Sequence, residues 1–306
     1  MKLQNLTQSG GAPASILFHT TDEQGCARDV TRVFLPPQRL ILLGGGHVSQ
    51  ALCGYAVDLG FEVVVVDDRP AYANAERFPM ASRILCNGFE HAISELAITE
   101  YDYIAVVTRG HRHDALCLRA IFGGNAMPYY LGLIGSRRRT TELFALLKEE
   151  GFDPVKIERV HTPIGLPIGA ETPKEIAISI LAELILMRSK QKVDAEGLLE
   201  LTSGEPELRR VLLENKEPRA LAVVVKQAGS TPVPPGAIML VDQIGGIVGT
   251  VGGGCGEHEI VMRALEVLRT GKPELVTLDM TNDVVADEGM VCGGRMTVWI
   301  EPVKIQ

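Results

Sequence analysis

The sequence has no closely spaced cysteine pair, no excess of positive charge and no long apolar run. None of its six cysteines forms a Cys-x-x-Cys pair, which argues against a disulfide framework or a zinc knuckle. The formal net charge of −8 argues against a general affinity for nucleic acid. The most apolar helical stretch, residues 175–187, contains Glu183 and is too short to span a bilayer. We therefore expect neither nucleic acid nor a membrane as a partner.

The first ten residues, MKLQNLTQSG, lack the apolar core of a secretory signal peptide. We therefore expect a cytoplasmic protein, in which a thiol stays reduced and available for chemistry. With 306 residues the chain is long enough for two domains. Its 32 glycines fall in clusters, which indicates loops where the backbone approaches a ligand.

Between residues 37 and 190, short apolar runs alternate with helical patterns. The runs are continuously apolar, as in parallel strands that are covered on both faces. The expected strands are residues 39–43, 62–67, 83–86, 101–108, 129–135 and 156–162. This alternation predicts an α/β fold with a Rossmann-like, doubly wound parallel sheet. A capping box, T-P-K-E from Thr172 to Glu175, begins its last helix.

Residues 191–306 predict a smaller α+β domain with mostly antiparallel strands. It begins with a mostly polar helix at about 195–215. The expected strands are 220–225, 238–241, 246–251, 274–280 and 295–303, with a helix at 256–268. Residues 1–36 form a separate N-terminal segment with two strand-like runs, and they could supply edge strands to either domain.

A dinucleotide-binding pattern follows the first strand of the predicted parallel sheet. Gly44, Gly46 and Ser49 occupy the glycine positions of G-x-G-x-x-G, and the turn Gly44-Gly45-Gly46-His47 opens a helix. Asp67 ends the second strand, where a carboxylate grips a ribose hydroxyl in such sites. The pattern favours NAD(P), although any phosphate-bearing group could use the same backbone amides. A Rossmann sheet with an unused turn is the alternative.

Two further loops should lie at the same crevice, because they follow the fourth and fifth strands. The first contains Thr108, Gly110 and His111, and the second begins with Ser136 and Arg137. Arginines 137–139 could bind phosphate or carboxylate, or simply form a solvated helix start. His47 and His111 could bind a metal ion or transfer protons.

Two cysteines of the second domain are flanked by glycines. Cys255 follows Gly253 and Gly254 at the start of a predicted helix, and Cys292 lies in GMVCGG. A helix N-terminus lowers the pKa of a thiol, so Cys255 is a candidate nucleophile or ligand. The alternative is that both cysteines are small apolar residues beside tight turns. Ser230 and Thr231 lie in a proline-rich loop, where their hydroxyls bind a polar ligand or satisfy local backbone.

Several of these motifs together resemble the XdhC/CoxI family of accessory proteins for xanthine dehydrogenase and carbon monoxide dehydrogenase. The matching stretches are GGGHV (44–48), GFEVVVVDDRPAYANAERFP (60–79), VVTRGHRHD (106–114), YLGLIGSRRRT (130–140), HTPIGLPIGAETPKEIAISILAELI (161–185), GSTPVPPGAIMLV (229–241), GTVGGGCGEHE (249–259) and GMVCGG (289–294). Compared with that family the domain order is swapped, because here the Rossmann part comes first.

The resemblance implies a chaperone that binds the molybdenum cofactor (molybdopterin), holds it while a terminal sulfido ligand is installed, and passes it to an apo-enzyme. The implied partners are a molybdenum hydroxylase apo-enzyme, a cysteine desulfurase and a second copy of the chain. In this interpretation the Rossmann amides take the cofactor's phosphate or dinucleotide tail. Cys255 and Cys292 lie near its metal or sulfur end, with a molybdenum contact by Cys255 possible.

Two other functions remain open, and in both the chain would be an enzyme rather than a maturation factor. An NAD(P)-dependent oxidoreductase would use Gly44, Gly46 and Asp67, with His111 as its acid–base residue. A sulfur transferase would carry a persulfide on Cys255.

Overall fold

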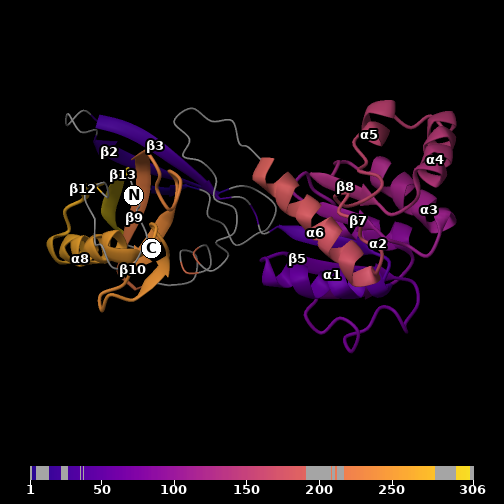
Figure 1. Cartoon of the computed structure of the whole chain (residues 1–306), viewed down its shortest axis with the longest axis horizontal. Coiled ribbons are helices and arrows are strands. Elements are labelled where there is room, and N and C mark those ends of the chain that lie inside the picture. Colours follow the sequence, from indigo (N-terminus) through magenta and orange to yellow (C-terminus); the bar gives the residue numbers. More distant parts are fainter. Residues whose placement is uncertain are drawn as a thin grey trace. The chain divides into compact units, whose positions relative to one another are not determined.

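The computed structural model describes residues 2–4, 14–21, 27–34, 36, 38–190, 208, 211, 217–279 and 294–303. The chain divides into two compact units. One is the continuous segment Pro36–Gln191, and the other joins Met1–Leu35 to Lys192–Gln306. Each unit has its own sheet and core (Figure 1).

The first unit contains a five-stranded parallel sheet. Its strands are β4 (Arg39–Leu43), β5 (Glu62–Asp67), β6 (Arg83–Cys86), β7 (Tyr103–Val106) and β8 (Tyr130–Leu133). Their spatial order is β6-β5-β4-β7-β8, and all neighbours are parallel. The order reverses direction at β4, so the switch-point crevice lies at the carboxyl ends of β4 and β7. The predicted Rossmann-like sheet is confirmed.

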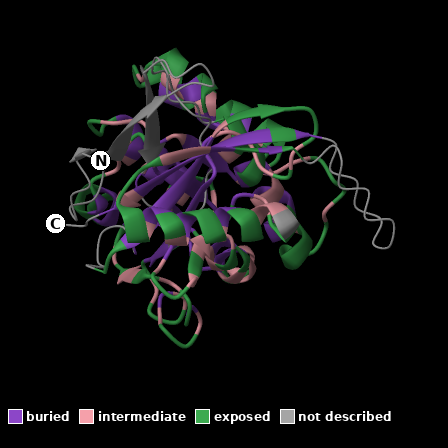
Figure 2. Ribbon diagram, turned by 90° about the vertical axis from the view of Figure 1, so that its left-hand side faces the viewer, coloured by how far each residue is buried: buried purple, intermediate pink, exposed green. Residues whose placement is uncertain are grey.

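Helices cover both faces of this sheet (Figure 1). They are α1 (His47–Asp58), α2 (Phe89–Leu96), α3 (His111–Phe122), α4 (Arg137–Glu149), α5 (Pro154–Glu158) and α6 (Pro173–Lys190). Side chains of α1 and α6 pack on one face, and those of α2, α3, α4 and α5 on the other. Most strand ribbons are therefore buried, whereas helices present exposed stretches outward (Figure 2).

The capping box at the start of α6 is confirmed. The Glu175 carboxylate accepts a hydrogen bond from the Thr172 backbone N–H at 2.8 Å, and the Thr172 hydroxyl accepts one from the Glu175 N–H at 3.3 Å. Ile180 and Leu184 are fully buried against the sheet. These reciprocal bonds satisfy donors that a helix start leaves unpaired.

The predicted sixth strand, residues 156–162, is wrong. Asp153 caps α5 by accepting a hydrogen bond from the Val155 N–H at 2.9 Å, and Pro154 occupies the first helical turn. Within 156–162 only an isolated parallel bridge, between Gly132 and His161, extends the sheet. The apolar spacing suited a strand, but the aspartate–proline pair begins a helix because proline fixes φ and needs no N–H there.

The second unit consists of antiparallel strands and one described long helix. A three-stranded sheet is formed by β1 (Lys2–Gln4), β2 (Ala14–Thr21) and β3 (Ala27–Phe34). A five-stranded sheet has the order β11-β10-β9-β13-β12. Its strands are β9 (Arg219–Ala228), β10 (Ile238–Val241), β11 (Ile247–Gly249), β12 (Glu274–Asp279) and β13 (Arg295–Val303). The predicted antiparallel α+β arrangement is confirmed, and β10 and β11 form a hairpin.

Both faces of the five-stranded sheet are covered. Helix α8 (Gly254–Thr270) packs Ile260, Ala264 and Val267 against one face. Leu208 and Val211 pack against the other face, beside Trp299. The predicted polar helix at 195–215 otherwise lies outside the described residues, as do the loop 281–293 and Cys292. In the described part of the chain, no helix is long and apolar enough to cross a membrane.

Candidate functional site

The glycine turn between β4 and α1 is wedged between the two neighbouring strands. Gly44 has φ +113°, a conformation that favours glycine, and its N–H donates to the Val66 carbonyl at 2.8 Å. A Cβ on Gly44 would lie 2.5 Å from the Val107 carbonyl oxygen. Ser49 is fully buried and its hydroxyl donates to the Gly44 carbonyl. Serine at the third position of the motif therefore stabilises the turn.

The N-terminus of α1 is open. Gly46 is its N-cap residue, no side chain caps it, and a Cβ built on Gly46 would meet nothing within 4 Å. His47, the first residue of the helix, is exposed. Backbone N–H groups at such a helix start attract anions, so the turn has both the donors and the space for a phosphate.

Asp67, the last residue of β5, has its carboxylate oxygens occupied. They accept hydrogen bonds from the Gly45 N–H at 2.8 Å and from Arg69 Nε and Nη2 at 2.8 and 3.0 Å. Burial alone would raise the pKa of Asp67, but the bonds from Arg69 and Gly45 outweigh it and lower the pKa. With 1% of its surface exposed, Asp67 positions the turn in this structure, and its contact with a ribose stays a prediction.

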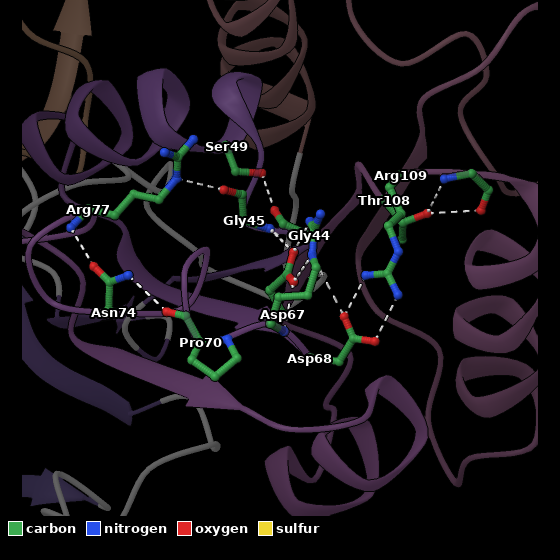
Figure 3. Close-up of polar contacts among 12 residues, drawn as sticks. Gly44, Gly45, Ser49, Asp67, Asp68, Pro70, Asn74, Arg77, Thr108 and Arg109 are labelled. Carbon is green, nitrogen blue, oxygen red and sulfur yellow. Dashed lines mark hydrogen bonds and ion pairs between the residues drawn. The ribbon is translucent and has the colours of Figure 1, made fainter.

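Two further charged residues, Asp68 and Arg109, meet across the end of β4 (Figure 3). Arg109 donates from Nη1 and Nη2 to the two Asp68 carboxylate oxygens at 2.5 and 2.9 Å. The hydrogen bonds from Arg109 lower the pKa of Asp68 to about 2, so the pair is ionised at neutral pH.

Arg77 contacts the turn from the segment after β5 (Figure 3). Its Nε donates to the Gly45 carbonyl at 2.9 Å. Its Nη2 is buried and has no hydrogen-bond partner among the described residues. Sequence reasoning did not select Asp68 or Arg77. Both residues lie in the stretch 60–79 that resembles the XdhC/CoxI family, which is the signal that could have found them.

The loop after β7 is built around Asp114. The Thr108 hydroxyl donates to Asp114 Oδ1 at 2.6 Å and accepts from the Gly110 N–H at 3.2 Å. Burial raises the pKa of Asp114, against the opposing effects of Thr108 and Arg139. Arg139 Nη2 lies 3.5 Å from Asp114 Oδ2, which links this loop to the start of α4. Sequence reasoning named Thr108 and Gly110 but did not select Asp114.

A small pocket lies between these two loops. It is lined by His111, Asp114, Leu133, Ile134, Gly135, Arg139, Thr140 and Leu143. Ser136 is the N-cap residue of α4 and Arg137 its first residue, and both are exposed. No group of three residues suited to hold a metal ion occurs among the residues that the structure describes.

The motifs of the second unit converge on one edge of its sheet. The end of β9 pairs with the start of β13 at Ala228 and Arg295, and the start of β10 pairs with the end of β11 at Met239 and Gly249. The proline-rich loop, the turn before α8 and Gly294 therefore meet at this edge.

Close contacts at two glycines hold these segments against the proline-rich loop. A Cβ on Gly252 would lie 2.4 Å from Pro232 Cγ, and one on Gly294 would lie 2.4 Å from the Ser230 carbonyl oxygen. The Thr231 hydroxyl donates hydrogen bonds to nearby acceptors, Gln227 Oε1 at 2.6 Å and the Val233 carbonyl at 3.1 Å. The loop with Ser230 and Thr231 thus packs against Gly252 and against Gly294.

Cys255 is the second residue of α8, and its side chain lies outside the described part. The backbone next to it is open, because a Cβ on Gly253 or Gly254 would meet nothing within 4 Å. Glu257 accepts hydrogen bonds from the Val251 and Gly253 N–H groups, each at 3.2 Å. Its carboxylate offsets the positive potential that the helix start offers a thiolate. Sequence reasoning did not include this residue.

Two family models match separate parts of the chain. The XdhC Rossmann domain matches residues 40–184, and the XdhC and CoxI family model matches residues 212–279. The chain belongs to the XdhC/CoxI family. The glycine turn and the Asp114 loop lie in its XdhC Rossmann domain, and the start of α8 lies in the XdhC and CoxI part.

Known relatives of this XdhC/CoxI protein match about half of the chain. It is 37% identical to a probable xanthine dehydrogenase subunit of Bacillus subtilis over 52% of the chain and 45% of that protein. It is 25% identical to the molybdenum cofactor insertion chaperone PaoD of Escherichia coli over 53% of the chain and 44% of that protein. The chain thus spans under half the length of these curated relatives. A crystal structure described as a xanthine dehydrogenase, from Bacillus halodurans, is 30% identical with a TM-score of 0.47, over 53% of this chain and 47% of that one.

Proposed function

We propose that this protein holds the molybdenum cofactor during maturation of a xanthine dehydrogenase-type hydroxylase. Membership of the XdhC/CoxI family and the names of two relatives support a maturation role. The observation that carries the proposal is the single sheet edge where the Ser230 loop, the turn before Cys255 and Gly294 meet. In the sequence, Gly294 follows Cys292 by two residues and Gly254 directly precedes Cys255.

The residues present suit such a cargo. A molybdopterin cofactor carries an anionic phosphate or dinucleotide tail, and the open α1 start at Gly46 suits an anion. Its other end carries sulfur and molybdenum, for which thiolates are good ligands. In the second unit, the open backbone at Gly253 and Gly254 leaves space beside Cys255.

Within this proposal the cysteines act as ligands or as sulfur carriers. Cys255 and Cys292 would hold the cargo while a cysteine desulfurase supplies the sulfur, and an apo-hydroxylase would then receive it. Formation of a homodimer in the cytoplasm is part of the same proposal, and sedimentation equilibrium tests the dimer.

The first experiment is anaerobic gel filtration of the protein with molybdenum cofactor released from a hydroxylase. Molybdenum and pterin fluorescence are measured in the protein peak for wild type, Cys255→Ala and Cys86→Ala. Cys86 is the control because it is an exposed free thiol on β6. For the wild type we expect stoichiometric co-elution of the cofactor. Cys255→Ala should lower the affinity for the cofactor about tenfold, or about 1.4 kcal/mol, and Cys86→Ala should leave it unchanged.

Gly46→Ala tests the tail site in the same assay. Gly46 has φ −68°, and its Cβ would enter open space, so the variant should fold normally and lose affinity. Failure of the wild type to retain molybdenum would contradict the proposal. If that protein instead oxidised NADH with a small carbonyl substrate, the oxidoreductase alternative would replace it. In a protein that retains no molybdenum, a sulfur adduct on Cys255 by intact mass would favour the sulfur transferase.

A further inference from the structure

An ion pair crosses the mouth of the switch-point crevice. Asp68 follows β5 and Arg109 follows β7, and these two strands flank β4 on either side. The pair therefore joins the segments that follow the two strands on either side of β4. Figure 3 shows it near Gly44 and Asp67. A ligand that lies in this crevice and extends from the β5 side to the β7 side would contact this ion pair.

The three arginines around the turn differ in how firmly they are held. Arg69 is bonded to Asp67, which is 1% exposed, so their separation would leave a buried charge unpaired. Arg77 keeps a buried Nη2 without a partner among the described residues. The side chains of Arg109 and Asp68 are 37% and 33% exposed, and such a solvated pair is easily exchanged.

We propose that Arg109 is an exchangeable anion contact of the crevice, which Asp68 holds when no ligand is bound and which a ligand phosphate takes over. The ligand class is a phosphate or pyrophosphate ester, and the inference rests on the proposed function in placing an anionic tail at the glycine turn. Arg109 is the donor that moves, from the Asp68 carboxylate to the ligand phosphate. Because Asp68 stays ionised at neutral pH, the exchange responds to anion concentration.

The test is calorimetric titration of the full chain with inorganic pyrophosphate at constant ionic strength. Asp68→Asn removes the competing carboxylate, and we expect about tenfold tighter binding. Arg109→Gln removes the contact, and we expect about tenfold weaker binding. In the double variant Asp68→Asn/Arg109→Gln, the gain from Asp68→Asn should disappear, because its effect acts through Arg109.

The control is another arginine–carboxylate pair with two hydrogen bonds and similar exposure, at the C-terminal ends of α3 and α4. Arg119 Nε and Nη2 donate to the Glu150 oxygens at 2.7 and 2.5 Å, with exposures of 34% and 30%. Glu150→Gln and Arg119→Gln change the net charge as the test variants do, and should leave pyrophosphate affinity unchanged.

Three outcomes would overturn the inference. The first is weaker pyrophosphate binding by Asp68→Asn, which would indicate that the ion pair is purely structural. The second is an equal shift of affinity in the control variants. The third is that neither the wild type nor Asp68→Asn binds pyrophosphate. The cofactor assay separates this failure from that of the proposed function. Retention of molybdenum that depends on Cys255, without the pyrophosphate pattern, would reject only the role of Arg109.

Discussion

At the scale of single residues, one buried carboxylate holds the glycine turn. Asp67 accepts from the Gly45 N–H, and its bonds to Arg69 keep it charged although it is almost inaccessible to water. Arg69 in turn lies over the Tyr72 ring, 3.6 Å from its centroid. The turn is thus preorganised by charge, and its open side at Gly46 is left for a ligand.

Asp67→Asn should destabilise the Rossmann unit by about 2 kcal/mol at pH 7, because the buried side chain loses its charge-assisted hydrogen bonds from Arg69 and Gly45. The folded-state pKa of Asp67 is lowered. Its contribution is therefore fully present above the unfolded pKa, about 4, and is lost as the pH falls through the folded value. The difference between wild type and Asp67→Asn should shrink at pH 3.

The measurement is urea unfolding of the intact chain, with hydrogen exchange of the β5 peptide reporting on the Rossmann unit. The chain's one tryptophan, Trp299, lies in β13 of the other unit, and its fluorescence transition should not move. Asp58→Asn, at an exposed position of α1, is the matched variant and should shift stability by less than about 0.5 kcal/mol. An equal loss in both variants would contradict this account of Asp67.

At the scale of elements, α6 docks on the sheet through a buried polar group. Glu183 accepts from the Tyr130 hydroxyl at 2.5 Å and from the Gly165 N–H at 2.7 Å, and lies 2.9 Å from His161 Nδ1. Burial would raise the pKa of Glu183, but these bonds lower it. The acid inside the apolar helix therefore ties α6 to β8 and to the segment that replaces the expected sixth strand.

Tyr130→Phe should lower the free energy of unfolding of the Rossmann unit by about 1–3 kcal/mol, because Glu183 loses a donor while it stays buried. Thermal unfolding followed by circular dichroism measures the shift. Tyr55→Phe removes a hydroxyl from an exposed side chain and serves as the comparison. If Tyr130→Phe is as stable as Tyr55→Phe, the Glu183 cluster does not anchor α6.

At the scale of the whole molecule, the chain consists of two units with separate cores. The Rossmann unit is continuous in sequence, and apolar clusters lie on both faces of its sheet. The second unit takes Met1–Leu35 from one end of the chain and Lys192–Gln306 from the other. Folding of the second unit therefore joins segments that the whole Rossmann unit separates.

Residues 36–191 expressed alone should fold cooperatively, because every described strand of the parallel sheet and its covering helices lie within them. Circular dichroism with a single sharp thermal transition is the expected result. Residues 192–306 alone lack β1 to β3 and should be less stable than the same unit in the full chain. A fragment 36–191 without a cooperative transition would contradict this division.

Local sequence was sufficient for most elements and insufficient for the contacts of the site. Buried parallel strands are continuous apolar runs, so β4, β5 and β7 could be predicted, as could the capping box of α6. The strand predicted at residues 156–162 was wrong, because Asp153 and Pro154 start a helix there. The pairing of Asp68 with Arg109 spans 41 residues, and no local pattern encodes it.

The sequence by itself determined the two domain types, the glycine turn, the position of Cys255 at a helix start and the resemblance to the XdhC/CoxI family. These features follow from apolar periodicity and from short motifs, which depend on neighbouring residues alone. Only the tertiary structure decided that Asp67 is saturated by Gly45 and Arg69, that Arg77 keeps a buried donor, and that the Ser230 loop packs against Gly294. Hydrogen bonds and ion pairs act over a few ångströms, so their partners depend on which strand ends and loops the fold brings together.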